Sequence, residues 1–190
     1  MHPRPVAPDE DSTTPVPVRP DFAAIFRTEF SYVWNALGRL GVDPSDREDV
    51  AHDVFHQVYR RLDDYDPARP LRPWLFGFAF RLASDHRRQA RKRYELIGID
   101  VEHFAGPPRP DDELSSAEER AIAEAALRVV ALERRAILIL HEIDGESVPT
   151  IATALEIPLN TAYSRLRLAR AEFATAVRKI RAEEGRHAAR

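Results

Sequence analysis

The sequence predicts an all-α protein made of two small helical domains joined by a flexible acidic linker. Apolar residues recur at steps of three and four along most of the chain, without the alternation typical of strands. A stretch rich in proline, glycine and acidic residues divides this helical pattern into two parts. The 190 residues provide room for one ordinary domain or two small ones.

We expect five segments along the chain. Residues 1–20 contain six prolines and few apolar residues, which is typical of a disordered tail. Residues 21–94 are expected to form the first helical domain, residues 95–115 the linker and residues 116–182 the second domain. Residues 183–190 are expected to form a second short tail.

Apolar stripes predict three helices in the first domain. We expect the first helix to begin at Asp21 and to end within residues 38–41, where two glycines lie. Ser45 is the expected cap of the second helix, which ends before Pro67, and Trp74 lies at the start of the third. Such a domain of about 75 residues can just sustain a core of its own.

The second domain is expected to begin with a helix capped by Ser115 or Ser116, with Glu118 or Glu119 placed for a capping box. Its apolar residues predict a second, smaller core. They are Ile122, Leu127, Val130, Leu132, Ile137, Leu138, Leu140 and Ile143.

Residues 144–170 have the pattern of a helix-turn-helix. Ser147 can cap a short helix, and that helix tolerates Pro149 because it lies in the first turn. A tight corner follows, and the second helix begins at Asn160 or a close neighbour. Glu156 occupies the turn position where a left-handed backbone favours glycine, at a cost of roughly 1 kcal/mol.

The second helix of this motif has an apolar side and a polar side. Its core stripe contains Ala162, Leu166, Ala169, Phe173, Val177 and Ile180. The opposite side contains Asn160, Thr161, Ser164, Arg167 and Leu168, flanked by Tyr163 and Arg165. In the major groove, arginine can pair with guanine, asparagine with adenine, and serine or threonine with bases or phosphate. These features favour DNA binding over the alternative of an ordinary helical hairpin.

The formal net charge of −3 conceals a strong segregation of charge. Residues 42–66 are mostly acidic, whereas residues 70–94 and 161–181 are strongly basic. Two basic segments in an acidic protein indicate two contacts with a polyanion, and the alternative is a pair of solvated helix faces.

Composition excludes several classes of protein. The absence of cysteine excludes disulfides, thiolate metal sites and a thiol nucleophile, and it is compatible with a reducing cytoplasm, where we expect the protein to lie. No apolar run is long enough for a membrane span, and residues 1–20 contain no signal-peptide core.

Three segments in order resemble the extracytoplasmic-function (ECF) group of bacterial sigma factors. "REDVAHDVFHQVYRRLDDYDP" is similar to the helix that binds core RNA polymerase, and "LRPWLFGFAFRLASDHRRQARKR" to the region for the promoter −10 element. "IPLNTAYSRLRLAR" resembles the region that reads the −35 element. The resemblance covers residues 21–94 and 118–181.

The resemblance implies that the first domain docks on the β′ clamp helices of core RNA polymerase and helps to separate the −10 DNA strands. The second domain would hold the −35 duplex beside the β flap, and the linker would thread between the domains. The implied partners are therefore core polymerase and promoter DNA. An anti-sigma factor is a further candidate partner, because many members of the group are held by one. No enzyme activity, cofactor or metal is implied.

The candidate site residues fall into three groups. The −35 group contains Asn160, Thr161, Tyr163, Ser164, Arg165, Arg167 and Arg170. The −10 group contains Arg72, Trp74, Phe80, Arg81, Arg87, Arg88 and Arg91, in which the two aromatic side chains could stack on unpaired bases. For Trp74 alone, burial in the core is the alternative. The polymerase-binding group contains Asp49, Asp53, His56 and Arg60.

The chain departs from the family pattern at several positions. Phe80 and Arg81 stand where Arg-Asn is common, and Gly77 replaces a usual arginine. Tyr163 stands where lysine is common in the recognition helix.

Two other classes of protein remain as alternatives. One is a helix-turn-helix regulator that binds paired half-sites as a dimer without polymerase. The other is a metal enzyme that uses His52 and His56 with Asp49 and Asp53, although no matching ligands occur elsewhere in the chain.

Overall fold

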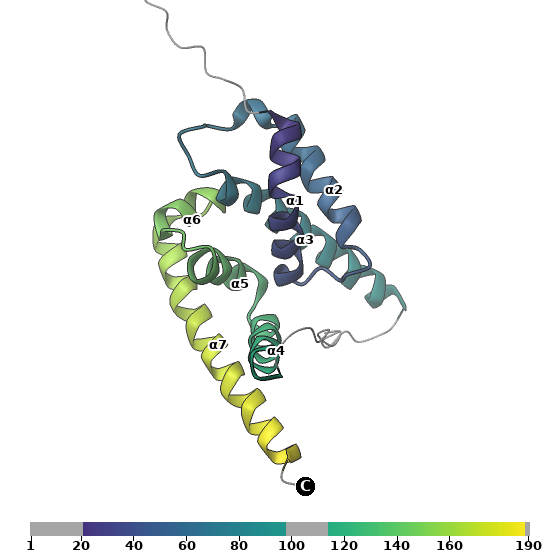
Figure 1. The fold of residues 1–190 in the computed structure, drawn as a ribbon, viewed down its shortest axis with the longest axis vertical. Helices are drawn as coiled ribbons and strands as arrows, with labels where there is room; N and C mark the ends of the chain where they lie inside the picture. The colour runs from purple at the N-terminus through teal and green to yellow at the C-terminus, as the bar shows by residue number, and fades with distance from the viewer. Residues whose placement is uncertain (1–20, 98–113, 189–190) are drawn as a thin grey trace, which may run out of the picture.

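The computed structural model describes residues 21–97 and 114–188, and these residues form helices and turns without any strand. The all-α prediction is thereby confirmed for the described part of the chain. Figure 1 shows the first three helices gathered in one half and the last four in the other. The expected tail at residues 1–20 and most of the expected linker lie outside the described residues.

The first domain contains α1 (Phe22–Leu40), α2 (Arg47–Arg60), a 3-10 turn (Leu62–Asp64) and α3 (Leu71–Ile97). The side chain of Asp21 accepts a hydrogen bond of 3.0 Å from the backbone N–H of Ala23 and so caps α1. Gly41 ends α1 in the left-handed conformation, with φ of 95°, as glycine does at many helix ends.

Several helix ends differ from the sequence predictions. Ser45 does not cap α2, because the N-cap residue is Asp46, and the Ser45 hydroxyl bonds only the Asp46 carboxylate at 3.3 Å. Ser115 and Ser116 lie inside the first turn of α4 (Leu114–Val129), so neither is its N-cap. The helix that begins at Leu71 extends to Ile97, and the next helix begins at Leu114, so both enter the expected linker at residues 95–115. The last helix extends to Ala188 and so enters the expected tail at residues 183–190. Sequence patterns locate helix ends less exactly than helix interiors.

The second domain contains α4 (Leu114–Val129), α5 (Leu132–Leu138), a π-helical turn (Ile139–Ile143), α6 (Val148–Ala154) and α7 (Leu159–Ala188). Helix α7 packs against α4, α5 and α6 and is the long helix that runs down one side of Figure 1. Its neighbours α4, α5 and α6 also contact the first domain, through α1 and α3.

The sequence predicted two cores, whereas the structure joins them into one. Buried apolar residues of both domains form a single cluster. Val33, Leu37 and Leu40 contribute from α1, and Ala136 and Ile139 contribute from the second domain. The two domains therefore lie against each other in the structure, and their separation would expose apolar surface to water.

A buried arginine lies at the junction of the domains. Arg135 on α5 is 3% exposed, and it is the buried charged residue among those described. Its guanidinium donates hydrogen bonds to the backbone carbonyls of Val130 at 3.0 and 3.1 Å, to that of Leu40 at 3.1 Å, and to that of Arg128. Burial lowers the pKa of Arg135 to about 10. These bonds satisfy carbonyls at the ends of α4 and α1 that have no partner within their helices.

Replacing the buried guanidinium should destabilise the protein. Arg135→Met leaves several buried carbonyls without a donor, so we expect the free energy of unfolding to fall by about 2–4 kcal/mol. The measurement is urea denaturation followed by circular dichroism. Arg134→Met is the matched control, because Arg134 is about one-third exposed and pairs with Glu172, and its loss should cost less than about 1 kcal/mol. Equal losses in the two variants would contradict the role given to Arg135.

Candidate nucleic-acid interface

The helix-turn-helix is formed by α6 and α7. Ser147 is the N-cap of α6, and its hydroxyl accepts a hydrogen bond of 3.3 Å from the backbone N–H of Thr150. Pro149 lies in the first turn, where its missing N–H costs nothing. The buried side of α6 contains Ile151 and Ala152, as the sequence predicted. The helix is thus fixed at both its start and its inner face.

The turn between the two helices contains Glu156 in the left-handed conformation, with φ of 55°. Glu156 is the one residue other than glycine with a positive φ among those described. The sequence prediction of a left-handed residue at this place is confirmed. Because a glycine would adopt this conformation without strain, the presence of a glutamate calls for a reason that lies in its side chain.

Helix α7 presents a buried side and an exposed side, as its sequence predicted. Ala162, Leu166 and Ala169 are buried against the rest of the domain, and Phe173 packs at the edge of the same core. The exposed residues of the first three turns include Asn160, Ser164, Arg167 and Leu168. The polar side chains of this edge are therefore accessible without any change in the packing of the helix.

The flanking residues of the −35 group differ in their surroundings. The Tyr163 side chain is 53% exposed, whereas Thr161 and Arg165 are half-buried. Arg170 Nε donates a hydrogen bond of 2.8 Å to the Glu142 carboxylate, and Arg170 Nη2 lies 2.6 Å from the same oxygen. This ion pair joins α7 to the π-helical turn within the second domain.

The −10 group lies along α3, and its members have several different environments. Arg87, Arg88 and Arg91 are exposed along the second half of the helix, where Arg88 pairs with Asp85 at 3.0 Å. Near the start of α3, Arg72 pairs with Glu29 at 2.9 Å. The structure therefore brings a row of cations to one helix, as the sequence predicted.

The two aromatic residues of the −10 group are both half-buried. Trp74 packs on Tyr65 and Phe78, with ring centroids 4.9 Å apart in each pair. Phe80 packs against the core. Trp74 is compatible with both predicted roles, which were burial in the core and stacking on an unpaired base. It belongs to an aromatic cluster and still keeps part of its surface exposed.

The polymerase-binding group lies on the outer face of α2. Asp49, Asp53, His56 and Arg60 are all exposed. At about 100° per residue, they share a sector of roughly 60°, on the side opposite the buried Val54. A continuous polar face of mixed charge is available here to a protein partner. Among the described residues no cluster suited to a metal ion occurs.

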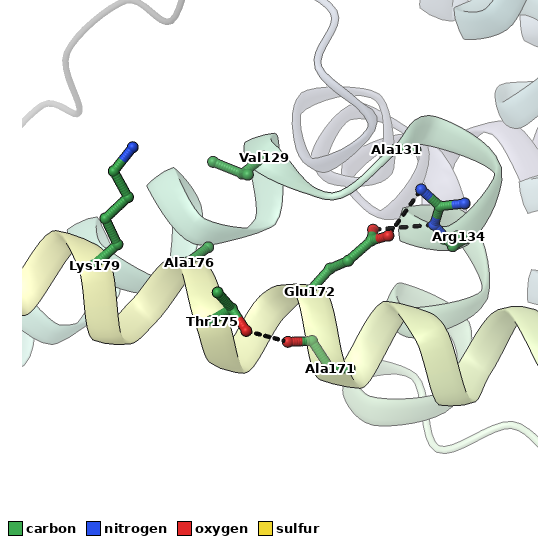
Figure 2. A pocket seen from close by; sticks show the side chains of 8 residues that line it. All are labelled: Val129, Ala131, Arg134, Ala171, Glu172, Thr175, Ala176 and Lys179. Carbon is green, nitrogen blue, oxygen red and sulfur yellow. Dashed lines mark hydrogen bonds and ion pairs between the residues drawn. The ribbon is translucent and has the colours of Figure 1, made fainter.

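A groove lies farther along the second domain, between the end of α4 and α7 (Figure 2). Val129, which is 57% exposed, and the side chains of Ala171 and Ala176 supply apolar surface. The ion pair between Arg134 and Glu172, at 2.8 Å, lies at one end. An apolar floor with charged edges is typical of a surface that receives a protein segment.

Comparison with known proteins decides the family. Residues 25–93 match the model of Sigma-70 region 2, and residues 120–173 match that of Sigma-70, region 4. RNA polymerase sigma factor NccH of Alcaligenes xylosoxydans xylosoxydans is 34% identical over 142 residues, which are 73% of this chain and 76% of NccH. ECF RNA polymerase sigma factor SigL of Mycobacterium tuberculosis is 31% identical over 147 residues, 77% of this chain and 82% of SigL.

This chain belongs to the ECF family of RNA polymerase sigma factors. It is a protein that directs RNA polymerase to promoters, and the match to both regions does not favour a stand-alone dimeric regulator. The sigma factor RpoE of Bartonella quintana, solved with the anti-sigma factor NepR, has the same fold, with a TM-score of 0.65. RpoE is 21% identical to this sigma factor, and the match covers 83% of this chain and 97% of RpoE. No described helix is long and apolar enough to cross a membrane.

The sequence did not reveal three contacts between the domains of this sigma factor. They are the Arg135 hydrogen bond to Leu40, the Tyr32 hydroxyl bonded to Asp144 at 2.7 Å, and an ion pair of Arg81 with Glu156 at 3.1 Å. Periodicity describes one helix at a time and carries no signal of such pairing. The unusual glutamate at the left-handed turn position was the one available signal.

Loss of the α6 cap should weaken the sigma factor's second domain. We expect Ser147→Ala to lower the free energy of unfolding by about 1 kcal/mol, because the backbone N–H of Thr150 loses its acceptor. Thermal and urea unfolding measure this loss. Ser45→Ala is the control and should change stability by less than about 0.5 kcal/mol, since Ser45 caps no helix. A larger loss in Ser45→Ala than in Ser147→Ala would show that the assigned cap is wrong.

Proposed function

We propose that this sigma factor reads the −35 element with the exposed edge of α7 and binds the −10 element along α3. The observation that carries the proposal is the exposed polar edge formed by Asn160, Ser164 and Arg167 at the start of α7. Arginine is the commonest partner of guanine in the major groove, and an asparagine pairs with adenine. The helix N-terminus adds a site for phosphate at the same end.

For the −10 element, the proposed role of each residue on α3 follows from its environment. The exposed Arg87, Arg88 and Arg91 hold the DNA backbone, and the exposed parts of Trp74 and Phe80 stack on bases that have left the duplex. Stacking is worth about 1–3 kcal/mol per base, which offsets part of the cost of unpairing.

For polymerase, the proposed contacts are the outer face of α2 with the β′ clamp helices and the α4–α7 groove with the β flap. The α2 face is supported by its exposure and mixed charge, and the groove by its exposed apolar floor. An anti-sigma factor is a further proposed partner, because RpoE was solved with NepR and CnrH with the cytosolic domain of CnrY. The protein is proposed to act in the cytoplasm, as a binding subunit without catalysis or a cofactor of its own.

Run-off transcription tests the proposed function. Purified core polymerase is incubated with a promoter library in the presence and absence of this chain, and the products are sequenced. The proposal predicts defined transcripts that need the chain and that share upstream elements near −35 and −10. Tight binding of the chain alone to duplex DNA, with no effect on initiation, would overturn the proposal.

Arg167 should provide sequence discrimination. If it pairs with a guanine, Arg167→Ala weakens the preference for the best −35 sequence by about 1–3 kcal/mol. Competition binding of the holoenzyme with single-base variants of the element measures this preference. Arg178→Ala is the matched control, since Arg178 is exposed on the same side of α7 three turns beyond the reading edge. An equal loss on every sequence would make Arg167 a phosphate contact instead.

The face of α2 should determine the affinity for polymerase. Asp53→Lys reverses a charge in the middle of this face, and we expect at least a tenfold weaker affinity for core polymerase with an unchanged fold, because the side chain is exposed. Fluorescence anisotropy of the labelled chain measures the affinity. Glu48→Lys makes the same change of charge on α2 outside the face and should have little effect. Similar losses in both variants would refute the assignment of the face.

A further inference from the structure

Three unusual positions of the sequence meet at one contact between the two domains. Gly77 and Arg81 lie on α3, in the proposed −10 region, and Glu156 lies in the turn of the helix-turn-helix. Arg81 and Glu156 are 75 residues apart in the sequence, yet their side chains form an ion pair. The contact joins the proposed −10 reader to the motif that reads −35.

Gly77 permits the close approach of the two helices. A Cβ atom at this position would lie 2.6 Å from the backbone carbonyl oxygen of Ala154, at the end of α6. A distance so short cannot be relieved by rotation of a side chain, since the opposing atom belongs to the backbone. Any side chain at Gly77, including the arginine usual in the family, would therefore push α6 away from α3.

Arg81 and Glu156 close the same contact on its outer side. Arg81 Nη1 lies 3.1 Å from Glu156 Oε1, with 36% of the Arg81 side chain and 70% of the Glu156 side chain exposed. The Arg81 guanidinium also lies 4.8 Å from the ring centroid of Phe78. Burial lowers the pKa of Arg81, and the Glu156 carboxylate opposes this shift. The carboxylate therefore gives a reason for a glutamate in a left-handed conformation.

The rest of the interface holds the same closed arrangement. The Tyr32 hydroxyl donates a hydrogen bond of 2.7 Å to Asp144, and burial together with this carboxylate raises the pKa of Tyr32. Arg135 donates to the carbonyl of Leu40 across the same junction. The ion pair and the close helix approach thus belong to an extended interface.

This closed arrangement is incompatible with simultaneous reading of both promoter elements. By their positions, the −35 and −10 elements are separated by about 25 base pairs, which is about 85 Å of duplex at 3.4 Å per base pair. In the structure the turn that leads into α7 contacts Arg81 of the proposed −10 group through the ion pair of 3.1 Å. The domains must therefore separate before the chain can span a promoter.

We propose that Gly77, Arg81 and Glu156 form an interdomain lock that holds the sigma factor closed, with the Glu156 carboxylate occupying a −10 arginine in place of DNA phosphate. The closure itself is a property of the free chain, while the consequence for promoter binding rests on the proposed function. Core polymerase would open the lock by binding the two domains at separate places. The lock therefore lowers promoter binding by the chain outside the holoenzyme.

Fluorescence energy transfer within the free chain tests the lock. The chain contains no cysteine, so Ala68→Cys and Ala174→Cys provide two unique exposed labelling sites, one in each domain. We expect a predominantly closed population in the otherwise native chain. Glu156→Gln should lower the ratio of closed to open molecules about two- to fivefold, as expected for a partly exposed ion pair. Gly77→Ala should lower this ratio at least as much, with the helical circular dichroism unchanged.

Two control variants separate the lock from general effects of charge. Glu142→Gln removes the pair with Arg170 inside the second domain and should leave the transfer unchanged. The double variant Arg81→Glu with Glu156→Arg restores opposite charges and should return the ratio toward that of the native chain. An open native chain, or unchanged transfer in both Glu156→Gln and Gly77→Ala, would overturn the lock. Addition of core polymerase should lower the transfer, and a failure of this step alone would count against the proposed function.

Discussion

The buried guanidinium of Arg135 is the interaction on which the arrangement of this sigma factor depends. A charged group taken out of water destabilises a protein unless hydrogen bonds replace those of water. Here the replacement comes from backbone carbonyls at the ends of α4 and α1, including that of Leu40 in the other domain. Because Arg135 lies on α5, it fixes α5 against α1, and the positions of the neighbouring helices follow. The approach of α6 to Gly77 on α3 belongs to the same junction between the domains.

The apolar core shared by both domains lies inside the molecule, and most of the proposed binding surfaces lie on its outside. The reading edge of α7 and the polar face of α2 are exposed in the closed arrangement, whereas Arg81 on α3 is held by Glu156. Opening requires the exposure of apolar residues now shared by both domains, and this cost must be offset by contacts with polymerase and promoter. A closed free chain and an open bound chain can then be two populations of one equilibrium.

Much of the local structure could be predicted from the sequence, because helix periodicity and capping are local properties. Ser147, the left-handed Glu156 and the buried stripe through Leu166 all lie where their neighbours in sequence require. The cap at Ser45 was wrong because α2 begins one residue later, after Asp46, and the Ser45 hydroxyl bonds the Asp46 carboxylate. The union of the cores could not be predicted. It depends on partners such as Tyr32 and Asp144, which are 112 residues apart and whose types are common on solvated surfaces.

A reversible cross-link across the α3–α6 contact tests the account most directly. Arg81→Cys and Glu156→Cys supply the only two thiols of the chain, and a short bis-maleimide linker with a reducible bond can join them across the closed interface. The same protein after reduction is its own control for the loss of the two side chains. The account predicts that the cross-linked chain fails to support promoter-dependent initiation by core polymerase, and that reduction raises initiation to the level of the same double variant labelled at both thiols without a cross-link. Equal initiation before and after reduction would contradict the account, because the chain would then work with its domains held together.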